Sequence, residues 1–284
     1  MRQFVIPRSR EITLLLLVFL ILTLGFIFSP VATGDDWETF YGAARRILAG
    51  QNLYASPVTF AYYSNPPWVA LSILPFSLLP FRWGWALLCT ASFLAAQAVA
   101  RRWGLSLGKT ALALLSPSML YIVLHGQIDM LLLAGLWLPQ AWWPLLALAK
   151  PQVAFGLLFG VPRSLWLRAL LITGGVALLC LVLFGLWPLD LIRQPRPFAS
   201  EPHNLWLGLW PYQVPAGVVM ILIGITRRDE KLLVAGSPFL FPYAAISSLI
   251  GPWLAASHFL KDWQALLVWL TWWGAVLYRS LGGG

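Results

Sequence analysis

The chain has 284 residues, of which 60% are hydrophobic and only 10% are charged, and its mean hydropathy is +0.77. Such a composition excludes a soluble globular domain of this length and indicates a membrane protein with several spanning segments. The formal net charge of +9 is no indication of nucleic-acid binding, because Lys and Arg accumulate in the cytoplasmic loops of membrane proteins.

The first predicted element is an apolar run over residues 12–28 that follows a basic N-terminus. This run is longer than the apolar part of a signal peptide, which has about 7 to 15 residues. We therefore predict an uncleaved signal anchor with its N-terminus in the cytoplasm. The acidic residues that follow it, Asp35 and Asp36, would then lie on the extracytoplasmic side.

A short amphipathic helix is expected next, because apolar residues recur at helical spacing over residues 37–48. Such a helix would lie on the membrane surface, and Gly50 would end it. Asp35 and Glu38 fit a capping box, which gives Asp35 a structural explanation. Asp36 has no such explanation. The helix dipole favours its ionised form, so its carboxylate could serve as a general base, unless both acids only cap the helix.

The rest of the chain consists of apolar stretches, several of them shorter than the about 20 residues that a full helical span needs. We predict an all-α bundle of about ten or eleven spans, some of them half-helices. Basic clusters indicate three cytoplasmic turns, at residues 101–109, 163–168 and 227–231. The Pro-rich stretch 68–81 would reverse this topology if it crossed the membrane. We therefore interpret it as re-entrant or interfacial, and residues 32–83 as an outer juxtamembrane region of a single transmembrane domain, 1–284.

In this topology the unusual polar residues share the outer face. A lysine at membrane depth is costly, so Lys150 is a candidate for neutralising a lipid-linked phosphate, or it extends its ammonium to the interface without a role. Gln127 is a candidate sugar ligand, since amides form hydrogen bonds with sugar hydroxyls, whereas a helix cap can explain Asp129. Tyr41 and Tyr63 could stack on a sugar, although interfacial anchoring explains most aromatic residues of such a chain.

A late outer loop carries further polar residues, namely Arg193, Arg196, Glu201, His203 and Asn204. Its arginines could help Lys150 to hold a phosphate, and the loop could position the acceptor, although ordinary solvated charges explain it equally well. A divalent metal could be held by Asp35, Asp36, Glu201 and His203, but their spacing does not favour it, and we predict neither a metal nor a cofactor. Cys89 and Cys180 also lack metal-ligand spacing.

The order of the motifs resembles a known family. The segments that carry the resemblance are 36–44, 50–54, 63–68 (Tyr-Ser-Asn-Pro-Pro-Trp), 125–127 (His-Gly-Gln), 150–152 (Lys-Pro-Gln), 203–204 (His-Asn) and 237–243. In this order they resemble GT-C fold glycosyltransferases, specifically glycosyltransferase family 87. The resemblance implies a GT-C-like bundle in the plasma membrane, acting on its extracytoplasmic face. It implies transfer of a sugar, often mannose, from a polyprenyl phosphate to a hydroxyl of a lipid or glycan acceptor.

By this resemblance Asp36 would be the catalytic base of a single displacement with inversion, and Asp35 a secondary acid. Asn65, Gln127, Gln152, His203 and Asn204 would contact the sugar or the acceptor. The chain is shorter than typical members, so an inactive scaffold descended from such a transferase is an alternative. A transporter or flippase for a lipid-linked solute is another, because broken helices and a buried lysine suit it too. The partners expected are the donor, the acceptor and membrane lipids, and no nucleic acid.

Overall fold

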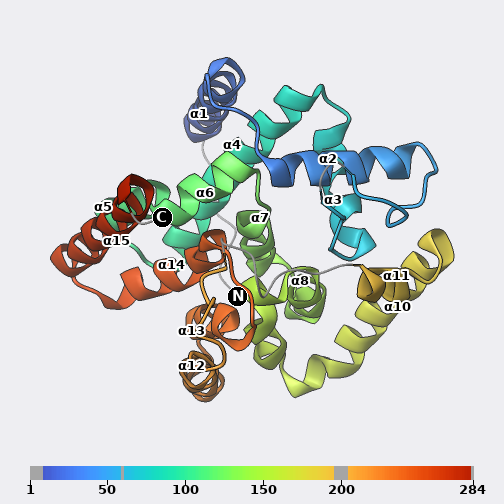
Figure 1. The fold of residues 1–284 in the computed structure, drawn as a ribbon. Helices are drawn as coiled ribbons and strands as arrows, with labels where there is room; N and C mark the ends of the chain where they lie inside the picture. The colour runs from blue at the N-terminus through green and yellow to red at the C-terminus, as the bar shows by residue number, and fades with distance from the viewer. Residues whose placement is uncertain (1–8, 59–60, 195–203, 283–284) are drawn as a thin grey trace.

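The computed structural model describes residues 9–58, 61–194 and 204–282, and every regular element in these ranges is helical (Figure 1). The α-helices are α1 (Ser9–Phe28), α2 (Asp35–Leu48), α3 (Pro67–Ser77), α4 (Phe81–Arg102), α5 (Leu107–Leu114), α6 (Pro117–His125), α7 (Asp129–Ala134), α8 (Trp143–Ala149), α9 (Pro151–Ala154), α10 (Trp166–Phe184), α11 (Trp187–Arg193), α12 (Val214–Arg227), α13 (Glu230–Gly236), α14 (Ile250–Phe259) and α15 (Asp262–Gly282). Short 3-10 helices connect several of them: η1 (Gly135–Trp137), η2 (Gln140–Trp142), η3 (Phe155–Gly160), η4 (Arg163–Leu165), η5 (Ser237–Leu240) and η6 (Ile246–Leu249). The predicted all-α class is confirmed for the described ranges.

Two helices in these ranges are long and apolar enough to cross a membrane, Phe81–Arg102 and Arg163–Phe184. A third crossing is added if α5 and α6, which are bent by 44° relative to each other, form one broken span. Other apolar helices are shorter, among them α3 and α12. The structure therefore supports a membrane protein with two or three candidate spans, and it does not confirm the predicted ten or eleven.

Helix α4 connects two polar ends of the molecule. At its start, the Phe81 carbonyl accepts a hydrogen bond from the Trp37 indole at 3.0 Å, and Arg82 donates to carbonyls just after α1. At its end, Arg102 donates twice to the Glu230 carboxylate, at 2.6 and 2.8 Å. A helix of 22 residues is about 33 Å long, close to the roughly 30 Å of a hydrocarbon core. The start of α2 and the start of α13 are thus about one bilayer apart.

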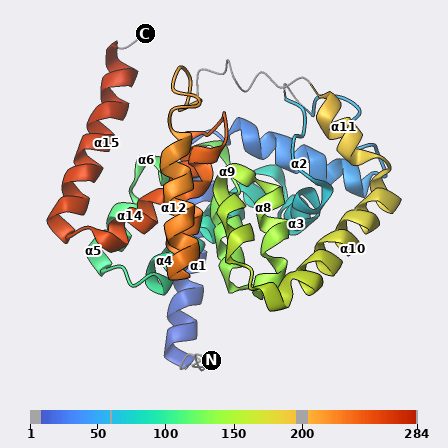
Figure 2. The same cartoon turned by 90° about the horizontal axis from the view of Figure 1, so that it is seen from below.

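The end of the molecule that holds Arg102 gathers more charges. Lys109 of α5 lies 3.4 Å from the carboxylate of Asp262, the first residue of α15. Next to them, His258 Nδ1 lies 2.5 Å from the Trp103 carbonyl. Figure 2 shows α1 and α12 lying along one axis and α2 lying across it. The contacts at the two ends of α4 therefore form two polar groups, which this apolar helix separates.

Helix α2 forms as predicted, but its apolar face is covered by protein. Trp37 is fully buried and Phe40 nearly so, and they pack in the core beside α3 and α6. The prediction that this face lies on the membrane is wrong, because a period of 3.6 residues identifies a buried face without showing what covers it. Gly50 does follow the helix end, at φ +63°.

The predicted capping box at the start of α2 does not form. The N-cap residue is Gly34, and no side chain accepts a hydrogen bond there. Asp35 is instead the first residue of the helix, and its side chain is exposed. The nearby Pro-rich segment forms α3, whose 11 residues extend about 16 Å. That length agrees with the prediction that this segment does not cross the membrane.

Candidate functional site

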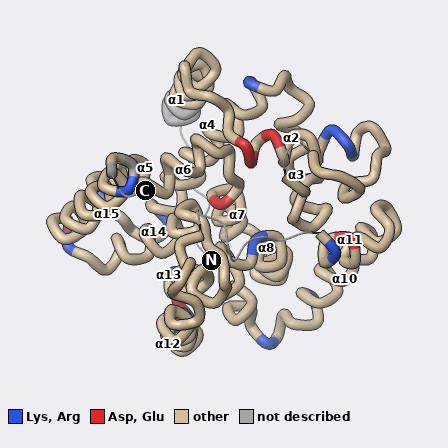
Figure 3. The backbone as a smooth tube through the Cα atoms, viewed as in Figure 1, with Lys and Arg blue, Asp and Glu red and all other residues tan. Residues whose placement is uncertain are grey.

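A polar cavity of about 790 Å³ opens between the start of α2, the loop before α3, the junction of α8 and α9, and the loop after η5. Its polar lining residues are Asp36, Thr39, Tyr62, Ser64, Asn65, Gln127, Lys150, Gln152 and Tyr243. Of the described residues that line it, only Asp36 is an acid and only Lys150 is a base. In Figure 3 the acidic start of α2, an acidic part of α7 and a basic segment beside α8 lie around the middle of the molecule. The cavity thus combines one acid and one base from distant parts of the chain.

Asp36 is held in place by its neighbours on α2. The adjacent Trp37 side chain is fully buried, and its hydrogen bond to α4 fixes the first turn of the helix. Arg82 binds the Ser29 and Val31 carbonyls, which restrains the segment that leads into α2. This packing turns the Asp36 side chain toward the cavity.

Two glycines allow the start of α2 to approach the end of α6. A Cβ on Gly34 would lie 2.1 Å from the Leu124 carbonyl oxygen, and one on Gly126 would lie 2.5 Å from the Trp37 Cβ. Gly126 also adopts φ +69°, a conformation that ends α6 and that residues with a side chain rarely adopt. This close approach brings Gln127 within hydrogen-bonding distance of Asp36.

A hydrogen-bond chain crosses the floor of the site. Gln127 Nε2 donates to Asp36 Oδ2 at 2.5 Å, and Lys150 Nζ donates to Gln127 Oε1 at 2.6 Å. Lys150 Nζ also donates to Asp129 Oδ2 at 2.5 Å, forming a buried ion pair. Asp129 is fully buried and Lys150 is 8% exposed. Four polar side chains from α2, α6–α7 and α8–α9 therefore form one connected network.

Two residues of this network, Lys150 and Asp129, lie where one helix ends or another begins. Lys150 lies between α8 and α9 with an extended backbone, φ −148°, and Pro151 begins α9. Asp129 is the first residue of α7, but its side chain accepts no capping hydrogen bond. The helix-cap explanation of Asp129 is therefore wrong, and its partner is Lys150. Sequence reasoning left Asp129 out of the site, although two opposite charges within apolar segments are a signal for such a pair.

Burial raises the pKa of the Asp36 carboxyl above its usual value. The positive charges of Lys150 and His125 and the hydrogen bond from Gln127 act in the opposite direction, while the Asp129 carboxylate adds to the rise. The sequence prediction considered only the helix dipole, which favours ionisation. Desolvation has the largest effect on this pKa, because the carboxyl faces a cavity and is partly shielded from bulk water.

The structure brings together some of the predicted sugar-binding residues. Asn65, Gln127 and Gln152 line the cavity together with Asp36. Tyr41 and Tyr63 do not line it: their hydroxyls donate to the Leu79 and Pro66 carbonyls, each at 3.1 Å. Both rings are used in packing. Sequence proximity to the acidic motif could not show this, because it does not reveal where a ring points. Instead, aromatic side chains that sequence reasoning did not select line the cavity: Phe40, Tyr62, Phe241 and Tyr243.

The late outer loop was predicted to contact the phosphate, the sugar or the acceptor, but its described candidate residues do not line the cavity. Asn204 is buried, donates to the Pro242 carbonyl at 2.9 Å and accepts from the Ala244 backbone at 3.2 Å. It thereby shapes the loop that lines the cavity and does not itself line it. Arg193 is exposed at the end of α11 and is not a lining residue either. Three residues of this loop lie outside the described ranges, namely Arg196, Glu201 and His203.

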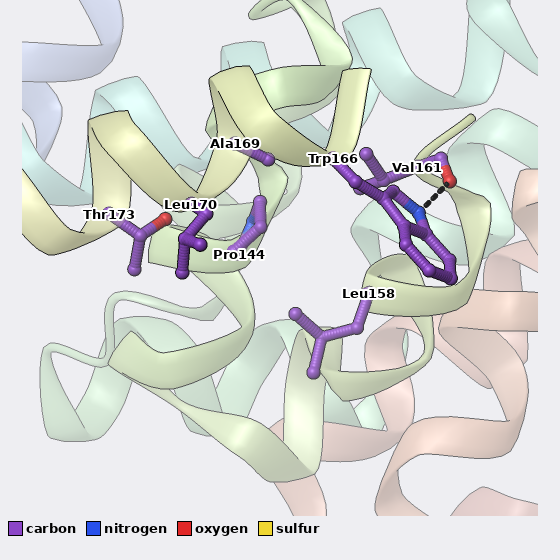
Figure 4. Close-up of a pocket in the computed structure, with 7 residues that line it drawn as sticks. All are labelled: Pro144, Leu158, Val161, Trp166, Ala169, Leu170 and Thr173. Atoms are coloured by element: carbon purple, nitrogen blue, oxygen red, sulfur yellow. Dashed lines mark hydrogen bonds between the residues drawn. The ribbon is translucent and has the colours of Figure 1, made fainter. Parts of the chain in front are cut away.

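A second hollow, of about 230 Å³, lies between α10, α8 and η3 (Figure 4). Its lining is apolar apart from Thr173 and the Trp166 indole, and the indole donates to the Val161 carbonyl at 3.0 Å. It holds no acid or base, so the first cavity is the candidate site. Among the described residues, no group of three or more His, Cys, Asp or Glu is arranged to hold a metal ion.

The close approach at Gly126 can be tested against a matched glycine. Gly50 has a similar φ, +63°, but a Cβ there would meet nothing within 4 Å. Gly50→Ala is expected to lower the free energy of unfolding by about 1–2 kcal/mol, the strain of the left-handed conformation alone. Gly126→Ala should lower it by about 2–4 kcal/mol, because the methyl group also overlaps Trp37. Thermal unfolding in detergent measures both, and equal losses would contradict the close approach.

Comparison with family models, with curated proteins and with solved structures found no match to this chain.

Proposed function

We propose that the chain is a membrane glycosyltransferase, in which Asp36 activates an acceptor hydroxyl and Lys150 stabilises a departing lipid phosphate. One observation carries this proposal: Asp36 and Lys150 line the same cavity and are bridged by Gln127. A carboxylate and an ammonium across a cavity provide the two charges that a displacement at a sugar carbon needs.

In the proposed step, Asp36 takes the proton of the acceptor hydroxyl as the acceptor oxygen bonds to the anomeric carbon. The bond from that carbon to the phosphate oxygen breaks, and the phosphate leaves with the electron pair. Attack opposite the leaving group inverts the configuration of the anomeric carbon. Asp36 Oδ2 is engaged by Gln127, and Oδ1 accepts no hydrogen bond from the described residues, so Oδ1 would receive the proton.

Lys150 has hydrogen atoms available for the phosphate. An ammonium has three donors, and Asp129 and Gln127 use two of them. The third would stabilise the charge that develops on the leaving phosphate. Because Asp129 already neutralises the ammonium, the cavity has no surplus of positive charge. A polyprenyl monophosphate has a single phosphate group and a modest charge. It suits such a site, because the leaving group must also be released after the reaction.

The remaining lining would hold the sugar. The amides of Asn65 and Gln152 can form hydrogen bonds with sugar hydroxyls, and the rings of Tyr62 and Phe241 can stack on a sugar face. The length of α4 supports a membrane-bound donor, because the cavity lies near one end of a segment about as long as a bilayer is thick. We place this end on the extracytoplasmic side of the plasma membrane, opposite the basic turns.

Transfer itself is the test. The purified protein in lipid nanodiscs is incubated with polyprenyl-phosphate sugars, mannose first, and with lipid or glycan acceptors. The expected result is a glycosylated acceptor with inverted anomeric configuration. Saturable flux in sealed proteoliposomes without a covalent product would instead show a transporter of lipid-linked solutes. The lack of any saturable affinity for a polyprenyl phosphate would indicate a scaffold without catalytic activity.

A further inference from the structure

We infer that Gln127 is a positioning residue, which orients the Asp36 carboxylate through a hydrogen-bond chain anchored at Asp129, and that it is not primarily a sugar ligand. This inference rests on the proposed function, and it changes the role that the sequence predicts for Gln127. It follows from the direction of each hydrogen bond, from burial and from the backbone of the turn that carries this side chain.

Lys150 determines which group donates and which accepts in each hydrogen bond of this network. An ammonium can only donate hydrogen bonds, so the Gln127 atom that faces it at 2.6 Å must be the amide oxygen. The amide nitrogen then faces Asp36 and must donate to it. Of the two ways to orient the Gln127 amide, only this one satisfies both neighbours. Lys150 thus determines which Gln127 atom Asp36 meets.

Asp129 anchors the other end of the chain. It is fully buried and does not itself line the cavity, and it forms a buried ion pair with Lys150, which does. Removing either charge from such a pair is costly, so the ammonium stays beside Asp129. An anchored ammonium in turn holds the Gln127 oxygen in one place.

The backbone also restricts the position of Gln127. Its N–H donates to the Ile122 carbonyl at 2.9 Å, which closes the end of α6, and Gly126 provides the left-handed turn. The residue is only 8% exposed, so its side chain keeps little rotamer freedom. With its oxygen and one amide hydrogen used inside the protein, Gln127 holds Asp36 Oδ2. The consequence is that Asp36 Oδ1 is the oxygen that remains for the acceptor.

The groups around Asp36 determine in which direction its pKa should change when Gln127 is replaced. From packed elements, Lys150, His125 and Asp129 act on Asp36, and Asp35 and Glu38 lie on its own helix. The Gln127 hydrogen bond is one of the interactions that lower the pKa of Asp36. Removing it must therefore raise this pKa further, so that the base stays protonated up to a higher pH. A residue that only bound sugar would not produce this change.

The test compares Gln127→Met with Gln152→Met, since both amides line the cavity and only Gln127 is bonded to Asp36. Infrared titration follows the carboxylic-acid band of Asp36, identified by its loss in Asp36→Asn, and needs no substrate. In Gln127→Met this band should persist to higher pH. At the acid end of the pH profile, kcat/KM should fall by about tenfold, with the loss shrinking as pH rises, and the donor KM should stay within about twofold. Gln152→Met should leave the titration as in the natural protein.

An unshifted titration in Gln127→Met, whether the donor KM rises or not, overturns the inference. If Gln127→Met does not fold, Gln127→Leu replaces it: this variant has a similar size, offers no donor to Asp36 and adds no charge, so the pKa of Asp36 must rise for the same reason. If no protein shows transfer, the proposed function fails, while the titration alone still supports or overturns the control of Asp36 by Gln127.

Discussion

Asp36→Asn is expected to lower the rate of sugar transfer by about 100- to 10,000-fold, the usual contribution of a general base. The substitution keeps the shape of the side chain, and the amide oxygen can still accept the hydrogen bond from Gln127. It removes the negative charge and with it the ability to take a proton. Binding of the donor should therefore survive, and kcat should carry the loss.

The adjacent acid provides the matched control. Asp35 precedes Asp36 in the same helical turn, but its side chain is exposed and does not line the cavity. Asp35→Asn is expected to keep the transfer rate within about twofold. The measurement is kcat with a polyprenyl-phosphate sugar for both variants, after thermal melts show equal folding. Equal losses in the two variants would mean that the acidic start of α2 acts as a whole, and undiminished turnover in Asp36→Asn would remove it as the base.

Three residues of the network could be selected from the sequence because each of them is unusual where it stands. Asp36 follows an apolar run without a capping role, Gln127 interrupts two apolar stretches, and Lys150 lies at membrane depth. Polar groups in such places are costly and need partners. The structure adds the partners: one network includes all three residues and Asp129.

Aromatic positions could not be predicted in this way. Tyr41 and Tyr62 both lie in the outer region near the acidic motif, yet only Tyr62 lines the cavity. The difference depends on tertiary contacts: the Tyr41 hydroxyl finds the Leu79 carbonyl, and its ring packs against Phe81 at a centroid distance of 5.1 Å. A sequence gives the ring and its neighbours along the chain, but not the direction in which the ring points.

The apolar pattern was informative about helices and much less so about the membrane. It predicted α2 and a helix break at Lys150, because periodicity and Pro151 act locally. It could not distinguish a face covered by lipid from one covered by protein, as Trp37 shows. The same ambiguity affects the number of spans, since a short apolar helix such as α3 is compatible with the interior of a bundle and with a bilayer.

Asp129→Asn is expected to destabilise the protein by about 3–5 kcal/mol, because it leaves the Lys150 ammonium buried without its counter-charge. Lys150→Met should be similarly destabilising, since it leaves the Asp129 carboxylate unpaired. The double variant Asp129→Asn with Lys150→Met removes both charges, and it should recover most of the stability that either single variant loses. The three variants form a thermodynamic cycle whose coupling energy reports the ion pair.

The control is Asp262→Asn, which breaks an ion pair at the other polar end of the molecule. The Asp262 side chain is 73% exposed and lies 3.4 Å from Lys109, so its loss should change stability by less than about 1 kcal/mol. Chemical denaturation in detergent measures all four variants. If Asp129→Asn is no less stable than Asp262→Asn, the buried pair is not a structural anchor. If the double variant regains stability but transfers no sugar, the Lys150 charge is required by the reaction and not by the fold.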